Sequence, residues 1–356
     1  MELRFFIIRR ILLLIPTMFG LTLAMFILEA AEPNKILTAP YVHPSPTVSA
    51  AVQERNAAIL LGLNYPLPIR YFVYLWNLLH GNFGVINLPG YPGNVLQAII
   101  LAFPNTITLA IFATVLSVAI AIPLGSYIGS RPNTFADSAG RVFSLSGYAM
   151  PAFWLGLLLQ IGLGKDIIAG NPLGIFPPYG SIPHLPIPPP SWFNNGYSYP
   201  THLFIIDALL HGNFSLAEHA FMYIVLPVLT LTYGILAGVL RFVRAGMVDE
   251  SHSEYVKTAR AKGVPERLVI RRHIRKNALI PTVTVLGLLF AFLLGGVVLV
   301  EVVFQYNGIG LLAVNSAIGY QIYGVIGTTL VFGVILMVAN LIVDIAYAMI
   351  DPRIRY

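Results

Sequence analysis

The sequence predicts an all-α polytopic membrane protein with six transmembrane helices. Its mean hydropathy is +0.77 and only 10% of its 356 residues are charged, which places it outside the range of soluble globular domains. Several long stretches contain no Asp, Glu, Lys or Arg. A helix needs about 20 mostly apolar residues to cross a bilayer core of roughly 30 Å, and these stretches are long enough.

The six expected spans follow from the uncharged stretches. They are residues 11–28, 96–128, a segment between Arg141 and Lys165, residues 221–240, residues 278–300, and a segment late in the stretch between Glu301 and Asp344. The first segment has the basic start of a signal peptide, which is an alternative. The segment is longer than a typical signal peptide, and no clear cleavage site of small residues follows Leu28, so we expect it to remain as a span.

The distribution of charge predicts that both termini are cytoplasmic. Lys and Arg concentrate in the short cytoplasmic loops of membrane proteins. With both termini inside, 17 of the 21 basic residues are cytoplasmic, the exceptions being Lys35, Arg55, Arg70 and Lys165. The net charge of +6 is therefore mainly a topology signal. We expect membrane lipids and no nucleic acid as partners, and the cell (cytoplasmic) membrane as the location.

The chain divides into two parts. Residues 1–95 hold the first span and an outer segment, and residues 96–356 hold a core of five helices. Within this core, residues 165–220 form a long outer loop and residues 244–280 a cytoplasmic loop.

The outer loop contains FPPYGSIPHLPIPPPSWFNNGYSYP, which has too many prolines for a continuous helix. Its length favours an ordered external cap, with a solvated loop as the alternative. The phrase LLHGNF occurs at residues 78–83 and again at 209–214. We interpret the first copy as the end of a short amphipathic helix and the second as a chance match.

The cytoplasmic loop contains a basic stretch, TARAKGVPERLVIRRHIRKN, at residues 258–277. Ser251 and Glu254 match a capping box, which predicts that a helix begins near His252. Glycine commonly closes a helix in the left-handed conformation, and Gly263 follows the alanines of this stretch.

Pro265 suits the first turn of a new helix, which we expect to run to about Leu279. The predicted structure is therefore a helix, a sharp turn and a second helix. A helix lying on anionic headgroups and a plain topology signal are alternatives, but neither requires the tight turn.

The chain contains no GxxxxGK[ST] phosphate-binding motif, so ATP hydrolysis by that route is excluded. Ionisable residues in the expected spans are nearly confined to Glu301 and Asp344. Carriers coupled to protons or ions usually need a buried charged relay. If the protein transports a solute, we expect the energy to arrive from another subunit through the basic loop.

These segments resemble the membrane permeases of binding-protein-dependent ABC importers, specifically the dipeptide/oligopeptide/nickel class. The stretch EYVKTARAKGVPERLVIRRHIRKNALIP resembles the coupling loop of that class. RRILLLIPTMFGLTLAMFIL is similar to its first helix, PNTITLAI with IPLG to its second, and MPAFWLGLLL to its third. The resemblance covers nearly the whole chain. The C-terminal pattern is carried by Asn340, Asp344, Tyr347, Asp351, Pro352 and Arg353.

The resemblance implies a type I ABC importer permease fold and a set of partners. These are a second homologous permease subunit, two ATP-binding cassette ATPase subunits and an extracellular substrate-binding protein. ATP and Mg are expected on the ATPase subunits, so this chain is expected to carry no cofactor, no metal and no catalytic residue. The ATPase-coupling residues implied are Tyr255, Thr258, Ala259, Arg260, Ala261, Lys262 and Gly263.

In this interpretation the small alanines allow close approach of the ATPase, the glycine permits the bend, and the basic residues reach carboxylates on the partner. Closure of the ATPases would move the loops as levers and switch the core between inward- and outward-facing states.

Two departures from the family pattern lie on the expected outer face. The motif from Glu301 to Phe304 is followed by Gln305-Tyr-Asn-Gly308, where the family often has Trp-Pro-Gly. Gln321, Ile322 and Tyr323 stand where the family usually has an acid and a proline. Contacts with the binding protein and the outer gate therefore cannot be carried over.

Four residues are candidates for structural or gate roles: Glu301, Asn340, Asp344 and Tyr347. An acid at the outer end of a span is costly unless it is paired or wet. Glu301 is therefore either a gate residue or a structural acid bonded to nearby backbone. We expect Asp344 and Tyr347, one turn apart, to tie the sixth helix to its neighbours.

The function expected is that of a permease subunit forming half of a translocation pathway. The cargo would be oligopeptides, the commonest cargo of the family, or neutral oligosaccharides, which a sparsely charged interior also suits. One alternative is a membrane-embedded enzyme such as a lipid-linked glycosyltransferase, but the acidic residues of the outer loops are scattered and unpaired. A self-contained carrier is disfavoured by the lack of charges in the membrane.

Overall fold

The computed structural model describes residues 3–45, 47–169, 171–181, 189–194 and 197–350. Within these ranges the side chains of residues 3–4, 6, 197, 281, 283–292, 294–296 and 346–350 are not described. Asp351, Pro352 and Arg353, and the side chain of Tyr347, therefore lie outside the description.

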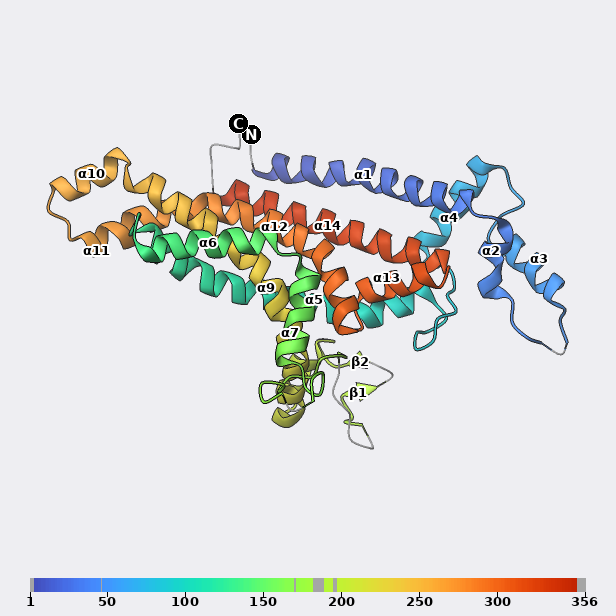
Figure 1. The fold of residues 1–356 in the computed structure, drawn as a ribbon. Helices are drawn as coiled ribbons and strands as arrows, with labels where there is room; N and C mark the ends of the chain where they lie inside the picture. Colours follow the sequence, from blue (N-terminus) through green and yellow to red (C-terminus); the bar gives the residue numbers. More distant parts are fainter. Residues whose placement is uncertain (1–2, 46, 170, 182–188, 195–196, 351–356) are drawn as a thin grey trace.

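The chain is almost entirely helical (Figure 1). The elements in chain order are α1 (Leu3–Ala31), α2 (Asn34–Thr38), the 3₁₀ helix η1 (Ala39–Tyr41), α3 (Ala50–Leu60), α4 (Leu67–Leu79), α5 (Val95–Gly129), α6 (Phe135–Ala149), α7 (Ala152–Leu163), β1 (Phe193–Asn194), β2 (Tyr197–Ser198), α8 (Phe204–Leu210), α9 (Phe214–Ser251), α10 (Glu254–Ala261), α11 (Glu266–Leu268), the π-helix η2 (Val269–Ile274), α12 (Arg275–Phe304), α13 (Ile309–Ile318) and α14 (Ile322–Ile350).

The all-α polytopic fold is confirmed. Among the described residues, α1, α5, α9 and α14 are long and apolar enough to cross a membrane. Two bent helix pairs bring the number of spans to as many as six, if each pair is one span. The expected spans at 11–28, 96–128 and 221–240 lie inside α1, α5 and α9.

The third expected span is not one straight helix. Helices α6 and α7 meet at an angle of 104°. Met150 between them has an extended backbone with ψ 118°, and Pro151 is the N-cap of α7. A proline disfavours the helical conformation of the residue before it and cannot donate a backbone hydrogen bond, which explains the break.

A second bend follows the fifth span. The end of α12 meets the short helix α13 at 76°, through Gln305, which has a φ of 47°. The sequence did not predict α13 as an element of its own. It lies between α12 and the last long helix, α14, and it packs against both of them and against α5.

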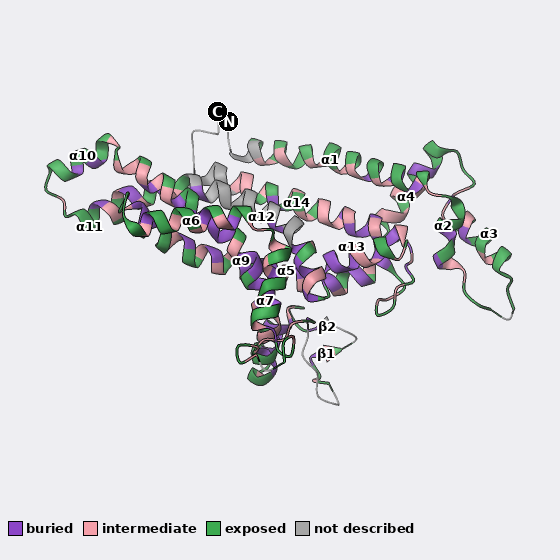
Figure 2. Cartoon of the chain, in the orientation of Figure 1, coloured by how far each residue is buried: buried purple, intermediate pink, exposed green. Residues whose placement is uncertain are grey.

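Helix α9 is the centre of the bundle. It packs against α5, α6, α7 and α12, and many of its residues are buried (Figure 2). Glycines of neighbouring helices allow the close approach. A Cβ atom added at Gly125 of α5 would lie 2.8 Å from Val243, and one added at Gly147 of α6 would overlap Ala237.

The long helices share one direction, with the loop containing α10 and α11 at one end and α2 and α3 at the other (Figure 1). α7 and the β1–β2 hairpin leave this body at a steep angle. In the hairpin Phe193 pairs with Ser198 and Asn194 with Tyr197.

The described part of the outer loop includes the β1–β2 hairpin and α8. Trp192 is buried there, with its ring 5.4 Å from the rings of Phe204 and His211.

The two copies of LLHGNF share the structure of a helix end, and the first ends a short helix as predicted, although it continues into a loop and the second continues into α9. Each copy closes a short helix, α4 or α8, through a left-handed glycine, Gly81 with φ 76° and Gly212 with φ 68°. The asparagine amide after each glycine donates to a carbonyl five residues earlier, at 2.9 Å for Asn82 and 2.8 Å for Asn213. This is the Schellman arrangement of a helix end.

The close packing of α6 on α9 gives a prediction. Gly147→Val forces a side chain into Ala237, and overpacking of this kind typically costs about 1–3 kcal/mol. We expect a lower midpoint of thermal unfolding for the detergent-solubilised variant. Gly162→Val is the control, because this helical glycine of α7 has no atom within 4 Å of an added Cβ. Equal midpoints for the two variants would contradict the packing described.

Candidate functional site

The basic loop protrudes from the bundle as a helix, a turn and a second helix. α10 begins at Glu254, with Ser253 as its N-cap, and Lys262 is its C-cap. Gly263 then has a φ of +74°, as the sequence predicted. The amide of Val264 donates to the carbonyl of Ala259 at 3.2 Å, so the turn is a Schellman arrangement in which the glycine conformation is required.

An ion pair braces this turn from outside. Arg260 donates from Nη2 to Glu266 Oε1 at 2.7 Å and from Nε to Oε2 at 3.0 Å. The hydrogen bonds to Arg260 hold the pKa of the Glu266 carboxyl below its usual range, and Glu266 raises the pKa of Arg260. Because both side chains are about half exposed, the pair shapes the turn more than it adds to global stability.

The coupling residues predicted from the resemblance lie on two sides of α10. Tyr255, Thr258, Arg260, Ala261, Lys262 and Gly263 are exposed. Ala259 is buried, with 8% exposure, beside Val256 and Val269 in the core of the bundle. Its small side chain therefore packs the loop against its own chain.

Two local predictions for this loop are wrong. Ser251 does not begin a helix, because α9 continues to it and its hydroxyl donates to the carbonyl of Val248 at 2.7 Å. The second helix does not end near Leu279. It passes from α11 through the π-turn η2 into α12, so loop and span form one continuous rod.

Tyr255 joins α10 to the end of α9. Its hydroxyl donates to Glu250 Oε2, which also accepts from Ser253 Oγ at 3.1 Å. α10 is thus fixed to the central helix by a polar bridge as well as by the buried Val256.

A buried carboxylate joins the same helix to α6. Asp137 is fully buried in the first turn of α6 and accepts from Nε and Nη2 of Arg244, the latter at 2.9 Å. The sequence analysis missed this pair because Asp137 was placed in a loop before the third span. Both residues lie just outside the expected spans, so the pair links the two helices next to the ends of those spans.

A second buried pair joins α1 to α4. Arg70 Nη2 lies 3.1 Å from Glu29 Oε1, and both side chains are almost inaccessible. The sequence places an acid, Glu29, and a base, Arg70, in the same outer segment, which was the available signal. Because the two residues are 41 positions apart, no local pattern indicates that they are in contact.

Glu301 holds the bend between α12 and α13. It is fully buried, accepts from Thr106 Oγ1 at 2.6 Å, and accepts from the amide of Leu311 at 3.1 Å. Thr106 in turn accepts from the amide of Ile309 at 2.9 Å. Of the two interpretations left open, this geometry favours a structural acid bonded to nearby backbone.

Two glycines make room for this carboxylate. A Cβ atom at Gly308 would overlap it, and one at Gly310 would lie 2.8 Å from Oε2. The sequence departs from the family pattern between Phe304 and Gly308, but Gly308 and Gly310 still leave room for the Glu301 carboxylate.

The remaining candidates lie on α14. Asp344 Oδ2 is 2.8 Å from Arg10 Nη1 of α1, so this acid lies between the sixth and the first helix. Asn340 is exposed, and the side chain of Tyr347 is outside the described part. These residues do not gather with Glu301 into one site.

A polar cavity of about 180 Å³ lies beside the Glu301 bend, between α5 and the outer cap. Asn105 Nδ2 on its wall donates to the carbonyl of Asn307 at 2.7 Å. Ser181, Ser198 and His202 contribute further polar groups, and none of the described residues that line it is acidic, lysine or arginine. Among the described residues, no three His, Asp or Glu side chains cluster as a metal site would require.

Residues 121–356 match the family described as "Binding-protein-dependent transport system inner membrane component". The chain is 34% identical to the oligopeptide transport system permease protein AppB of Bacillus subtilis, over 99% of both chains. It is 35% identical to the probable D,D-dipeptide transport system permease protein DdpB of Escherichia coli, over 86% of this chain and 85% of that one. It is also 34% identical, over 99% of both chains, to the glutathione transport system permease protein GsiC of Pectobacterium atrosepticum.

The geometry around Glu301 predicts a large cost of truncation. Glu301→Ala leaves a buried amide and a buried hydroxyl without a partner, each worth about 1–3 kcal/mol. We expect the free energy of unfolding in detergent to fall by at least that amount, measured by denaturant titration. Glu218→Ala, which removes an exposed acid of α9, is the control and should change little. An equal loss for both variants would contradict the role assigned to Glu301.

The Arg260–Glu266 pair predicts a pH dependence of the turn. Since the pKa of Glu266 is lowered in the folded chain, the pair contributes above the ordinary carboxyl pKa and is lost as the pH falls through the depressed value. Hydrogen exchange of residues 258–268, corrected for its intrinsic pH dependence, should accelerate on acidification. Glu266→Gln should remove this acceleration, and a variant that keeps it would rule out the pair as the cause.

Proposed function

The chain belongs to the family of binding-protein-dependent transport system inner membrane components, and we propose that it forms half of the pathway through which an ATP-driven importer moves oligopeptides. It is a non-catalytic, multi-pass permease subunit of the cell membrane. Permeases of this kind work together with ATPase and binding-protein subunits.

The protruding loop is the observation that carries the proposal. It offers a short helix, a glycine turn and an exposed basic surface, and it is fixed to the central helix by the Tyr255–Glu250 bridge and the buried Val256. A partner that grips the loop can therefore pull on α9 directly, and on α12 through the continuous rod of α11 and η2.

The mechanism proposed is a lever. Closure of two ATPase subunits on ATP and Mg moves the loop of this chain and that of a second homologous permease. α9 transmits the movement to α6 through the ion pair between Asp137 and Arg244. The pathway then changes from inward- to outward-facing, a rigid-body transition of packed helices. This chain makes and breaks no covalent bond.

Oligopeptides delivered by an extracellular binding protein are the proposed cargo. The relatives named for oligopeptide, D,D-dipeptide and glutathione transport support a peptide. The polar cavity of about 180 Å³ supports a neutral, hydrogen-bonding ligand, which includes the main chain of a peptide. The hydroxyl groups of an oligosaccharide fit the same lining, so this cargo is the second candidate.

Uptake by the complete complex in proteoliposomes tests the proposal. We expect ATP-dependent accumulation of a labelled oligopeptide, and no competition from a neutral oligosaccharide. Gly263→Val should lower this uptake at least tenfold while the complex still assembles and hydrolyses ATP. The physical reason is that a β-branched residue costs about 1–2 kcal/mol in the left-handed region, which disfavours the turn.

Gly212→Val is the matched control. Gly212 also has a positive φ and open space around an added Cβ, but it closes α8 on the side away from the loop. Full uptake by Gly263→Val, or an equal loss in Gly212→Val, would overturn the coupling assignment. Uptake of the oligosaccharide alone would overturn the peptide assignment and leave the coupling assignment standing.

A further inference from the structure

A second cavity, of about 340 Å³, lies between α6 and α9, beside the Asp137–Arg244 ion pair and apart from the Glu301 bend. Three of its residues are arginines. Its lining consists of Arg141, Ser144, Leu145, Tyr148, Arg241 and Arg244.

The cavity has an excess of positive charge. Arg244 is engaged by Asp137, and Arg141 Nη2 lies 3.8 Å from the same carboxylate and donates to Ser138 Oγ at 3.1 Å. Arg241 lies over the ring of Tyr148, 5.8 Å from its centroid, and no carboxylate among the described residues is within ion-pair distance of it. Three guanidinium groups thus share one carboxylate, which leaves two positive charges for a ligand.

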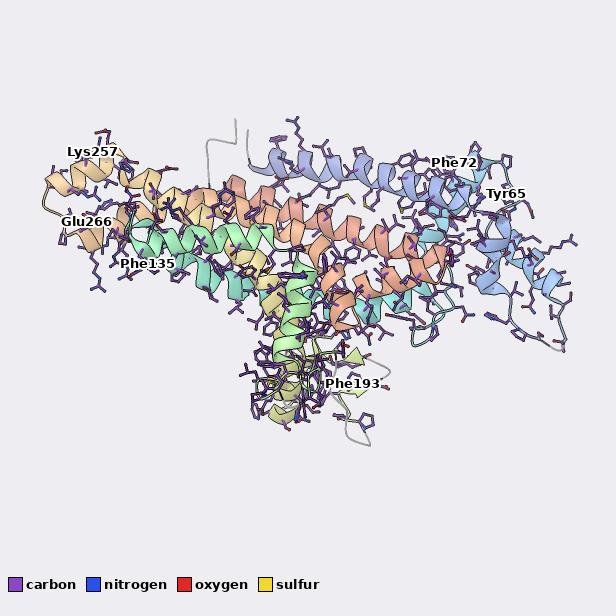
Figure 3. All side chains as sticks on the ribbon, viewed as in Figure 1. Tyr65, Phe72, Phe135, Phe193, Lys257 and Glu266 are labelled. Carbon is purple, nitrogen blue, oxygen red and sulfur yellow. The ribbon has the colours of Figure 1, made fainter. Side chains whose placement is uncertain are left out.

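The helix face next to the cavity is apolar and uncovered. Phe135 is 90% exposed, Val142 68%, Leu145 72% and Tyr148 57%. Figure 3 shows Phe135 at the start of α6, at the same end of the molecule as Lys257 and Glu266. Large apolar side chains this exposed are stable in contact with hydrocarbon or protein, but not in water.

The position of the cavity matches a membrane boundary. Helix α9 has 38 residues, about 57 Å at 1.5 Å per residue, so it extends well beyond a hydrocarbon core of roughly 30 Å. Arg241 precedes its end at Ser251 by ten residues, or about 15 Å. This is the side that the distribution of charge predicts to be cytoplasmic, where anionic lipid headgroups attract basic residues.

We propose that this cavity binds the phosphate group of an anionic phospholipid of the cytoplasmic leaflet, held by Arg141 and Arg241, with an acyl chain along the apolar face of α6. A phospholipid satisfies both features at once: its phosphate compensates the two positive charges that Asp137 leaves over, and its chain covers Val142 and Leu145. A free phosphate ion would use the charge and leave the apolar face uncovered. The proposal does not depend on the identity of the cargo.

Lipid retention by the purified complex tests this site. The complex is equilibrated in detergent with equal amounts of phosphatidylglycerol and phosphatidylcholine, and the lipid retained is counted by native mass spectrometry. We expect phosphatidylglycerol to be preferred. Replacing Arg141 and Arg241 together by Gln should weaken that preference by about fivefold for each charge removed.

The control is the double substitution Arg267→Gln and Arg271→Gln. It removes the same charge from exposed positions near the coupling loop that do not line the cavity, and we expect it to keep the preference. Both doubles should unfold at the wild-type temperature, because all four arginines are exposed.

Three results would overturn the proposal. Equal retention of the two lipids would exclude a headgroup site, and equal losses in both doubles would reduce the effect to net charge. Displacement of phosphatidylglycerol by excess inorganic phosphate, or by a peptide carboxylate, would identify a free anion as the ligand.

Discussion

A membrane leaves a chain no water with which to satisfy its polar groups, and the architecture follows from that constraint. Where the backbone leaves the helical ladder at the bend after α12, side chains of the same chain supply the missing hydrogen-bond partners. At the second bend Glu301 and Thr106 accept the amides of Leu311 and Ile309. The bend is therefore a fixed corner of the bundle, and the helices on both sides of it can move as rigid pieces.

The need to satisfy polar groups without water also explains why α9 occupies the centre of the bundle. It carries few side chains that need water along its middle, and small residues on α5 and α6 let those helices approach it closely. The coupling loop begins at the end of this best-packed element. Densely packed interiors transmit strain, so in the proposed lever mechanism a partner would act on the element with the most extensive packing.

Several features could be predicted from the sequence because they depend on local chemistry. Uncharged stretches located the spans, and Gly263 located the turn, since composition and backbone preference act over a few residues. Pro151 is a local signal for the bend between α6 and α7, but hydropathy, which located the spans, predicts one unbroken span there. The pairs Asp137–Arg244 and Glu29–Arg70 join residues 107 and 41 positions apart, and no local pattern indicates such contacts. The burial of Ala259 was hidden for the same reason, because the residues that cover it belong to other helices.

The ion pairs within the coupling loop have a consequence for how it meets another protein. Arg260 is neutralised by Glu266 and Lys257 by Glu254, which lies 2.7 Å away, while Lys262 has no carboxylate within ion-pair distance in the described structure. The loop thus presents less uncompensated charge than its sequence suggests. Screening by dissolved salt acts on exposed, uncompensated charges, so contacts made by α10 would depend on ionic strength less than contacts made by the exposed Arg267 and Arg271, which have no carboxylate within ion-pair distance in the described structure. The two arms of the loop would therefore hold a partner differently, α10 mainly by shape and the second arm through charges that dissolved salt weakens.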